Sequence, residues 1–252
     1  MCGENRGTRG CRGFLRKASH LLNQPCHATI GAMNYIRKVE NAKKLIRESI
    51  ATYPKIILGS SFGKDSMVTL HLTLSVKPDI PVFSVLADTE FPETYAFAEE
   101  MVRKYGLNYT PYVFEQVQGK KCCGESKVEK TREALKPYDA WISGVRKTEG
   151  ITRANFNPVE EKNGLTKINP ILEFTELDIW RYLALNEVPV NPKYKEGYRS
   201  LGCSLCSFPE EDESESERAG RWKGTTDACG ECGIHTQPLR NSFSEPREAQ
   251  VA

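Results

Sequence analysis

Apolar residues follow two different spacings in turn along the middle of the chain, and the alternation predicts strands and helices one after the other. Short apolar runs bounded by turn residues are typical of buried strands, whereas apolar positions three and four apart are typical of helices. The expected strands are residues 55–61, 80–88, 108–115 and 139–145, and the expected helices are residues 34–53, 66–76, 92–106, 126–136 and 175–188.

A regular alternation of strand and helix predicts an α/β fold with three layers, α/β/α, around a mainly parallel sheet. Ligands of such sheets bind beyond the carboxyl ends of the strands. We expect Gly106 to end the helix over 92–106, and Thr175 or the acids of the first turn to cap the helix over 175–188.

The two ends of the chain lack this pattern. Residues 1–32 are basic and poor in acids, which predicts a disordered leader, a transit peptide, or translation that starts at Met33. Residues 210–217 are acidic and polar, as in a hinge. We therefore expect a nucleotide- and cluster-binding α/β domain over 33–208, a mobile catalytic tail over 209–240 and a disordered end over 241–252.

Composition excludes several classes of function. Charged residues make up 27% of the 252 positions and the net charge is only +2, so bulk charge does not predict nucleic-acid binding. No apolar run is long enough to span a bilayer, and we expect no secretory signal. Nine cysteines, six of them in close pairs, favour metal binding or redox chemistry in the cytoplasm over structural disulfides.

A turn rich in serine follows the first expected strand and precedes a helix. Such a turn presents backbone amides and a helix dipole to an anion, and hydroxyls and a lysine strengthen the attraction. The expected phosphate-binding residues are Ser60, Ser61, Phe62, Gly63, Lys64, Asp65 and Ser66. Two further segments end at the same sheet edge, and they add Asp88, Thr89, Arg146 and Arg153 as candidate contacts to the ligand.

Four cysteines form a candidate metal set. Cys122 and Cys123 are adjacent, and Cys203 and Cys206 form a C-x-x-C pair farther along the chain. Adjacent ligands fit one tetrahedral zinc ion poorly, whereas a cubane cluster offers separate iron corners. The spacing favours a [4Fe–4S] cluster over zinc. A zinc site that combines the second pair with Cys229 and Cys232 stays an alternative.

Three motifs resemble one known group of enzymes. Residues 61–66, SFGKDS, resemble the PP-loop of the adenine nucleotide alpha-hydrolase-like superfamily, with Phe62 in place of the first glycine. The chain resembles the assimilatory adenylyl-sulfate reductases of the sulfonucleotide reductase family over roughly residues 56–236. The resemblance is carried by three segments: KKCCGESK (residues 120–127), GYRSLGCSLC (197–206) and ECGIHT (231–236). One departure is Glu149, which stands where that family usually has glutamine.

The resemblance implies a function and a set of roles. It implies a cytoplasmic enzyme whose substrate is adenylyl sulfate. A thiolate of the enzyme attacks the sulfur of this nucleotide and becomes an S-sulfonate. Thioredoxin, or glutaredoxin, then releases sulfite from the S-sulfonate. A homo-oligomer is possible. The implied catalytic residues are Cys232 and His235, the implied anion contacts are Lys127, Arg218 and Arg221, and the implied ligands of the [4Fe–4S] cluster are Cys122, Cys123, Cys203 and Cys206.

Alternatives to this function stay open. A PP-loop ATP pyrophosphatase or sulfur-transfer enzyme, such as a nucleic-acid thiolation enzyme or an adenylyltransferase subunit, shares the loop but does not need ECGIHT. A non-catalytic cluster protein is a third possibility. The 3′-phosphorylated nucleotide is an alternative substrate. Cys229 is either a resolving thiol for Cys232 or a bystander.

Overall fold

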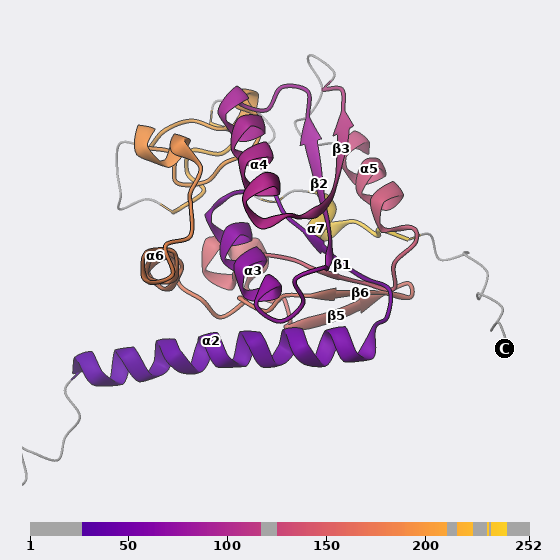
Figure 1. Ribbon diagram of the computed structural model, residues 1–252. Coiled ribbons are helices and arrows are strands. Elements are labelled where there is room, and N and C mark those ends of the chain that lie inside the picture. Colours follow the sequence, from indigo (N-terminus) through magenta and orange to yellow (C-terminus); the bar gives the residue numbers. More distant parts are fainter. Residues whose placement is uncertain (1–26, 117–124, 211–215, 224–230, 232, 241–252) are drawn as a thin grey trace, which may run out of the picture. The chain divides into compact units, whose positions relative to one another are not determined.

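The computed structural model describes residues 27–116, 125–210, 216–223, 231 and 233–240 (Figure 1). The chain divides into two compact units, residues 1–38 and 39–252. The helices are α2 (His27–Thr52), α3 (Lys64–Leu74), α4 (Pro92–Tyr105), α5 (Glu125–Leu135), α6 (Glu176–Leu185) and α7 (Gly233–Thr236), with short 3-10 turns η1 (Lys147–Glu149), η2 (Ile151–Arg153), η3 (Pro192–Glu196) and η4 (Ser204–Cys206). The strands are β1 (Ile56–Gly59), β2 (Pro81–Ala87), β3 (Asn108–Phe114), β4 (Ala140–Ile142), β5 (Val159–Lys162) and β6 (Leu165–Ile168).

The strands of the second unit form one sheet in the order β3-β2-β1-β4-β6-β5. All neighbours pair in parallel except β5 and β6, which pair antiparallel. The chain runs outward from β1 to β3, and then crosses back to add β4 on the other side of β1. The predicted α/β fold with a mainly parallel sheet is confirmed, and the order of strands reverses between β1 and β4.

The reversal places helices on both faces of the sheet. Because parallel crossovers are right-handed, α3 and α4 cover one face and α5 covers the other, as Figure 1 shows. Val128 and Leu135 of α5 pack with Ile57, Phe83 and Trp141 of the sheet in one buried cluster. On the opposite face, α3 packs against α6, where His71 Nδ1 lies 2.9 Å from the hydroxyl of Tyr182. His71 is thus a packing residue, as its place in a helix suggested.

The antiparallel hairpin of β5 and β6 was not expected from the hydrophobic pattern. Its turn is Asn163-Gly164, and both residues have positive φ, at 54° and 72°. A two-residue turn of this kind matches the twist of paired strands and is a strong local signal for a hairpin. The signal was present in the sequence, but the strands are only four residues long and three of the four residues of β5 are exposed.

The helix ends follow the expected local chemistry. α4 begins with Pro92, and Gly106 ends it with φ of 60°, a conformation that favours glycine. Thr175 caps α6 by accepting a hydrogen bond from the Asp178 amide at 3.2 Å, and the Asp178 carboxylate accepts from the Thr175 amide at 2.9 Å. Both predicted caps are confirmed. α3, by contrast, begins at Lys64, two residues earlier than predicted.

The described part of the tail packs on the core. Leu239 is buried in the same cluster as α5, and Asn163 of the hairpin turn donates to the carbonyl oxygen of Arg240 at 2.9 Å. Arg132 of α5 donates to the carbonyl oxygen of Pro238 at 3.0 Å. The expected domain boundaries stay predictions, because residues 1–26 and 241–252 lie outside the described residues. Among the helices that the structure describes, none is both long and apolar enough to cross a membrane.

The capping box of α6 provides a test of this local description. Thr175→Ala removes the hydroxyl that accepts from the Asp178 amide, and we expect it to lower the free energy of unfolding by about 1 kcal/mol in urea denaturation. Thr52→Ala, which removes an exposed hydroxyl bonded only to the carbonyl of Glu48, serves as a control and should change stability by less than about 0.5 kcal/mol. Equal effects of the two variants would contradict the capping role.

Candidate functional site

A pocket of about 180 Å³ opens where the order of strands reverses. Residues that follow β1 and β4 line it, together with residues of β2 and the first turn of α3. This is the place where ligands bind in open parallel sheets. We call it the central pocket. Eleven of the predicted site residues line it, namely Ser60, Ser61, Gly63, Lys64, Asp65, Ser66, Lys127, Arg153, Arg218, Arg221 and His235.

The turn between β1 and α3 contains a residue other than glycine in the left-handed conformation. Phe62 has φ of 55°, in the left-handed region that favours glycine, and its side chain is fully buried. The ring packs edge-on against Tyr109, with centroids 5.6 Å apart. Burial of a phenylalanine stabilises by about 1.5–3 kcal/mol, which offsets the roughly 1–2 kcal/mol that the backbone strain costs. Phe62 therefore supports the loop from behind and does not line the central pocket.

Gly144, directly after β4, lets this strand end approach the loop closely. A Cβ atom at this position would lie 3.0 Å from the hydroxyl of Thr69 and 3.1 Å from the Cα of Ser66. The close approach brings the segment that carries the predicted arginines against the first turn of α3. A larger residue here would push the two apart.

Lys64 is buried and its ammonium group has partners within the protein. It donates to the carbonyl oxygen of Arg199, and it lies 3.1 Å from a carboxylate oxygen of Glu217. Burial alone would lower the pKa of Lys64, but the charges of Asp65 and Glu217 outweigh burial and raise it. The Lys64 amide donates to the hydroxyl of Tyr194 at 2.7 Å. Lys64 thus connects the loop to the segments that carry Arg199 and Glu217. Its contact with a ligand stays a prediction.

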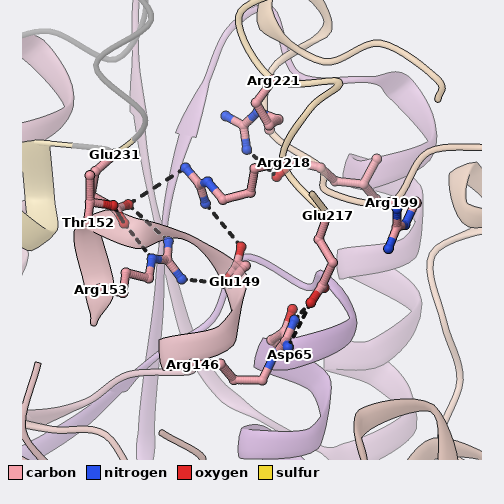
Figure 2. A network of polar contacts seen from close by, with 12 residues as sticks. Asp65, Arg146, Glu149, Thr152, Arg153, Arg199, Glu217, Arg218, Arg221 and Glu231 are labelled. Atoms are coloured by element: carbon pink, nitrogen blue, oxygen red, sulfur yellow. Dashed lines mark hydrogen bonds and ion pairs between the residues drawn. The ribbon is translucent and has the colours of Figure 1, made fainter. Parts of the chain in front are cut away.

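The guanidinium group of Arg146 also forms ion pairs with carboxylates of the protein. It is fully buried, it pairs with Asp65 of α3, and its two terminal nitrogens donate to Glu217 at 2.9 and 2.5 Å. Arg146 does not line the central pocket. Its two partners come from the first turn of α3 and from the tail, so this arginine joins the two segments, as Figure 2 shows.

A second group of ion pairs lies beside the first (Figure 2). Arg153 and Arg218 both contact Glu149 and Glu231, so that each arginine is shared by two carboxylates. We call these four residues the ion-pair ring. Burial would raise the pKa of Glu149, but Arg153, Arg218 and other cations outweigh burial and lower it to about 2. The acid at position 149 therefore has a structural explanation, because it is the shared acceptor of two buried arginines.

Arg221 links the central pocket to the second cysteine pair. Its guanidinium group donates to the carbonyl oxygen of Leu201 at 3.0 Å and lies 3.4 Å from the sulfur of Cys206. It also lies over the ring of Trp222, at 4.6 Å from the centroid. Gly202 makes this possible, since a Cβ atom there would collide with the guanidinium group.

Cys203 and Cys206 are both buried, and their sulfur atoms lie 3.2 Å apart. They sit in an apolar cluster with Ala87, Phe114 and Trp222, at the carboxyl ends of β2 and β3. This donor set suits a metal or an iron–sulfur cluster, because two thiols converge in a dry environment. Within the described residues no group of three metal-binding side chains forms, and Cys122 and Cys123 lie outside that part of the chain.

Thr89 supports the cysteine pair, and neither Asp88 nor Thr89 lines the central pocket. The carbonyl oxygen of Thr89 accepts from both the amide and the hydroxyl of Ser204, at 2.9 and 2.7 Å. Asp88 accepts from the amide of Gln116 at 2.9 Å, just before the segment that leads to Cys122. Their contact with a ligand stays a prediction.

His235 lies on the wall of the central pocket, stacked on Trp141. The ring centroids are 6.1 Å apart and the planes differ by 5°. Burial, together with the positive charges of Lys167 and Arg153, holds the pKa of His235 well below its ordinary value. The imidazole is therefore neutral near pH 7, and its Nδ1 has no hydrogen-bond partner among the described residues. The neighbouring Cys232 lies outside the described residues.

The family emerges from comparison of this chain with known proteins. The model of the phosphoadenosine phosphosulfate reductase domain matches residues 55–209, which is more than half of the chain. The chain belongs to this family. The adenosine 5′-phosphosulfate reductase of Halalkalibacterium halodurans is 32% identical, over 85% of this chain and 100% of that protein.

Some relatives in the phosphoadenosine phosphosulfate reductase family are named for adenosine 5′-phosphosulfate and others for phosphoadenosine 5′-phosphosulfate. An adenosine 5′-phosphosulfate reductase of Bacillus subtilis is 35% identical over 72% of this chain and 84% of that protein. The phosphoadenosine 5′-phosphosulfate reductase of Gloeobacter violaceus is 31% identical over 72% of this chain and 82% of that protein. Identity of this size does not separate the two nucleotides.

Solved structures of low sequence identity share the fold. The phosphoadenylyl-sulfate reductase of Candida auris aligns with a TM-score of 0.57 at 20% identity, over 73% of this chain and 98% of that chain. The FMN adenylyltransferase of Candida glabrata aligns with a TM-score of 0.60 at 21% identity, over 79% of this chain and 75% of that chain. The three-layer fold of this family member is therefore shared by both of these proteins.

Several residues of the family member's site were not expected from sequence. Tyr194 and Asn191 line the central pocket from η3 and its cap, Glu217 pairs with Lys64 and Arg146, and Glu231 pairs with Arg153. No local signal marks Glu217, because a glutamate in an acidic run is indistinguishable from a solvated one. Only Glu231 had a signal, since it belongs to the ECGIHT motif.

The ion-pair ring makes stability depend on pH through Glu149. A carboxylate whose folded pKa is lowered from 4.5 to about 2 stabilises the protein above about pH 4.5, and the stabilisation is lost as the pH falls toward 2. Glu149→Gln should lower the free energy of unfolding at neutral pH. The difference from wild type should shrink by about 2 kcal/mol between about pH 5 and pH 3 in denaturant titrations.

The control for this prediction is Glu161→Gln, which changes an exposed glutamate of β5. We expect it to differ little from wild type at every pH. A deficit of Glu149→Gln that stays constant across this pH range would contradict a strongly lowered pKa in the folded state.

Proposed function

We propose that this chain releases sulfite from adenylyl sulfate in assimilatory sulfate reduction, with Cys232 as the nucleophile and thioredoxin as the reductant. The observation that carries the proposal is that the chain belongs to the phosphoadenosine phosphosulfate reductase family. In addition, residues of the loop over 60–66 and cationic residues of the tail line the same central pocket. The residues on both sides of Cys232 support it, because Glu231 pairs with Arg153, and Ile234 and His235 line this pocket.

In the proposed reaction, the thiolate of Cys232 attacks the sulfur of the nucleotide. A bond forms between the two sulfur atoms, the bond from sulfur to the phosphate oxygen breaks, and AMP leaves with that electron pair. A thiolate of the reductant then attacks the sulfur of Cys232, and sulfite leaves with the electrons of the broken bond. A second thiol of the reductant frees Cys232, so that one dithiol supplies both electrons.

The chain's own residues supply the environment for these steps. Arg218, Arg221 and Lys127 add positive charge around the pocket, which favours both a thiolate and the anionic leaving group. His235, neutral near pH 7, is suited to accept or donate a hydrogen bond there and not to add charge.

We also propose a [4Fe–4S] cluster held by Cys122, Cys123, Cys203 and Cys206. The buried, converging pair Cys203 and Cys206 supports it. When bound, the cluster would hold together the segments that carry its cysteine ligands and would alter the local electrostatics, without passing electrons to the substrate. A cytoplasmic location is consistent with thiols that must stay reduced.

Sulfite release tests the reaction. The anaerobically purified protein should produce sulfite from adenylyl sulfate with thioredoxin, faster than from the 3′-phosphorylated nucleotide, and Cys232→Ser should abolish it because no other group forms the S-sulfonate. Cys229→Ser is the matched control in the same segment, and it should retain activity if Cys229 is a bystander. Pyrophosphate release from ATP without any sulfite would instead favour the ATP pyrophosphatase class.

Iron content tests the cofactor separately. The anaerobically purified protein should contain about four iron atoms per chain, and Cys203→Ser should lose most of them, because one corner of the cluster loses its ligand. Cys229→Ser should keep the wild-type iron content. Zinc in place of iron, lost on mutation of Cys229, would show that the alternative zinc site is correct.

A further inference from the structure

A second pocket lies beside the central pocket, between the hairpin of β5 and β6 and the tail. Its volume is about 360 Å³, and residues of β4, β5, β6 and α7 line it. We call it the hairpin pocket. Trp141, Ile234 and His235 line both pockets, so these residues lie at the boundary between the two. The hairpin pocket has the size of a small-molecule site.

The walls of the hairpin pocket are largely apolar. Trp141 and Leu165 contribute from the sheet, and Ile234 and Leu239 contribute from the tail. Trp141, Leu165 and Leu239 belong to one buried cluster with α5, and Ile234 packs against it. The core therefore fixes these walls, and a ligand with an apolar body would bury its surface against them.

One buried cation lies among these walls. Lys167 is only 8% exposed, and its ammonium nitrogen has no hydrogen-bond partner among the described residues. The nitrogen lies 3.4 Å from a carboxylate oxygen of Glu160, and 4.4 and 5.9 Å from the ring centroids of Phe156 and Trp141. A buried donor without an acceptor costs free energy. The hairpin pocket thus contains a strong donor that is suited to a ligand.

The charge of Lys167 is only partly compensated. Burial lowers the pKa of Lys167 to about 8, and the carboxylate of Glu160 does not outweigh burial. The ammonium form still predominates at pH 7. Glu160 also accepts a hydrogen bond from the side-chain amide of Asn169 at 2.9 Å, so its charge is shared between two partners. A further anion beside Lys167 would therefore be stabilised.

A second nitrogen of the hairpin pocket also lacks a partner. His235 Nδ1 is buried and has no hydrogen-bond partner among the described residues. The positive charge of Lys167 contributes to the lowered pKa of His235, so the two groups interact. An ammonium group and a protonated Nδ1 are both donors, and a carboxylate offers two acceptor oxygens. Glu161 and Lys162 also line the pocket, but they are exposed and opposite in charge.

We propose that the hairpin pocket binds a small organic carboxylate with an apolar body, and that Lys167 holds its carboxylate group. The apolar body lies against the walls from the sheet and the tail. Because Lys167 belongs to β6, and Ile234 and His235 belong to α7, the bound ligand contacts both the hairpin and the tail and stabilises the docking of α7. This binding does not rest on the proposed function.

Benzoate is the probe for this site, and benzamide is its neutral counterpart of the same shape. We expect wild-type protein to bind benzoate at pH 7 with a Kd on the order of 1 mM in an NMR titration. Benzamide should bind at least roughly tenfold more weakly, because it lacks the charge. Acetate should also bind at least roughly tenfold more weakly, because it carries the charge without the apolar body.

Lys167→Met removes the ammonium group and keeps an unbranched side chain. We expect it to weaken benzoate binding roughly 10–100-fold, as for the loss of a hydrogen bond to a charged group. The variant should still fold, since Glu160 is partly exposed and keeps its bond to Asn169. Lys104→Met is the matched control, because it makes the same substitution at an exposed position of α4, and it should bind benzoate as wild type does.

Hydrogen exchange locates the bound probe. Benzoate should slow the exchange of amides in residues 233–240 of wild type and of Lys104→Met, but not of Lys167→Met. Benzoate that binds without this protection would lie elsewhere and would overturn the inference.

Three results in the titrations would also contradict the site. These are equal affinities of wild type and Lys167→Met for benzoate, equal affinities of wild type for benzoate and benzamide, and binding of acetate as tight as that of benzoate. The last two comparisons use wild-type protein alone, so they decide the matter even where Lys167→Met does not fold. None of these measurements depends on sulfite release, and their outcome is therefore separate from that of the proposed function.

Discussion

The pairing of buried charges around the central pocket is the constraint on which the rest of this structure depends. Cations taken out of water must meet carboxylates or pay a large cost in desolvation. The cations are Lys64, Arg146, Arg153 and Arg218, and the carboxylates are Asp65, Glu149, Glu217 and Glu231. Two of these carboxylates belong to the tail beyond residue 209, so the floor of the pocket is neutral only when the tail is in place. The tail is thereby part of the site.

The same pocket brings the anion-binding loop and the cysteine pair into one place. Arg221 lines the pocket and also lies beside the sulfur of Cys206, so one guanidinium group is in contact with both regions. The sheet makes this possible, because β1, β2 and β4 all end at this edge. The cysteine pair and the loop over 60–66, which are far apart in the sequence, therefore share one electrostatic environment.

Particular residues show how far sequence reasoning reached. The helix ends at Gly106 and Thr175 were predictable, because a left-handed glycine and a capping hydroxyl act within four residues. The loop was predictable as well, although the left-handed conformation of Phe62, which favours glycine, was not. The hairpin at Asn163-Gly164 was missed although its turn signal is local, since strands of four residues carry little hydrophobic periodicity. Arg146 was correctly placed at the sheet edge, but its burial away from the pocket was not expected.

The sequence by itself determined the alternation of strands and helices, the position of the anion-binding loop and the family, because these depend on local spacing and on motifs that are contiguous in the chain. Only the tertiary structure decided which charges neutralise each other. Arg153 and Glu231 are 78 residues apart, and nothing in their neighbourhoods marks them as partners. An ion pair is specified by burial and by the approach of distant segments, and these arise when the sheet edge and the tail come together.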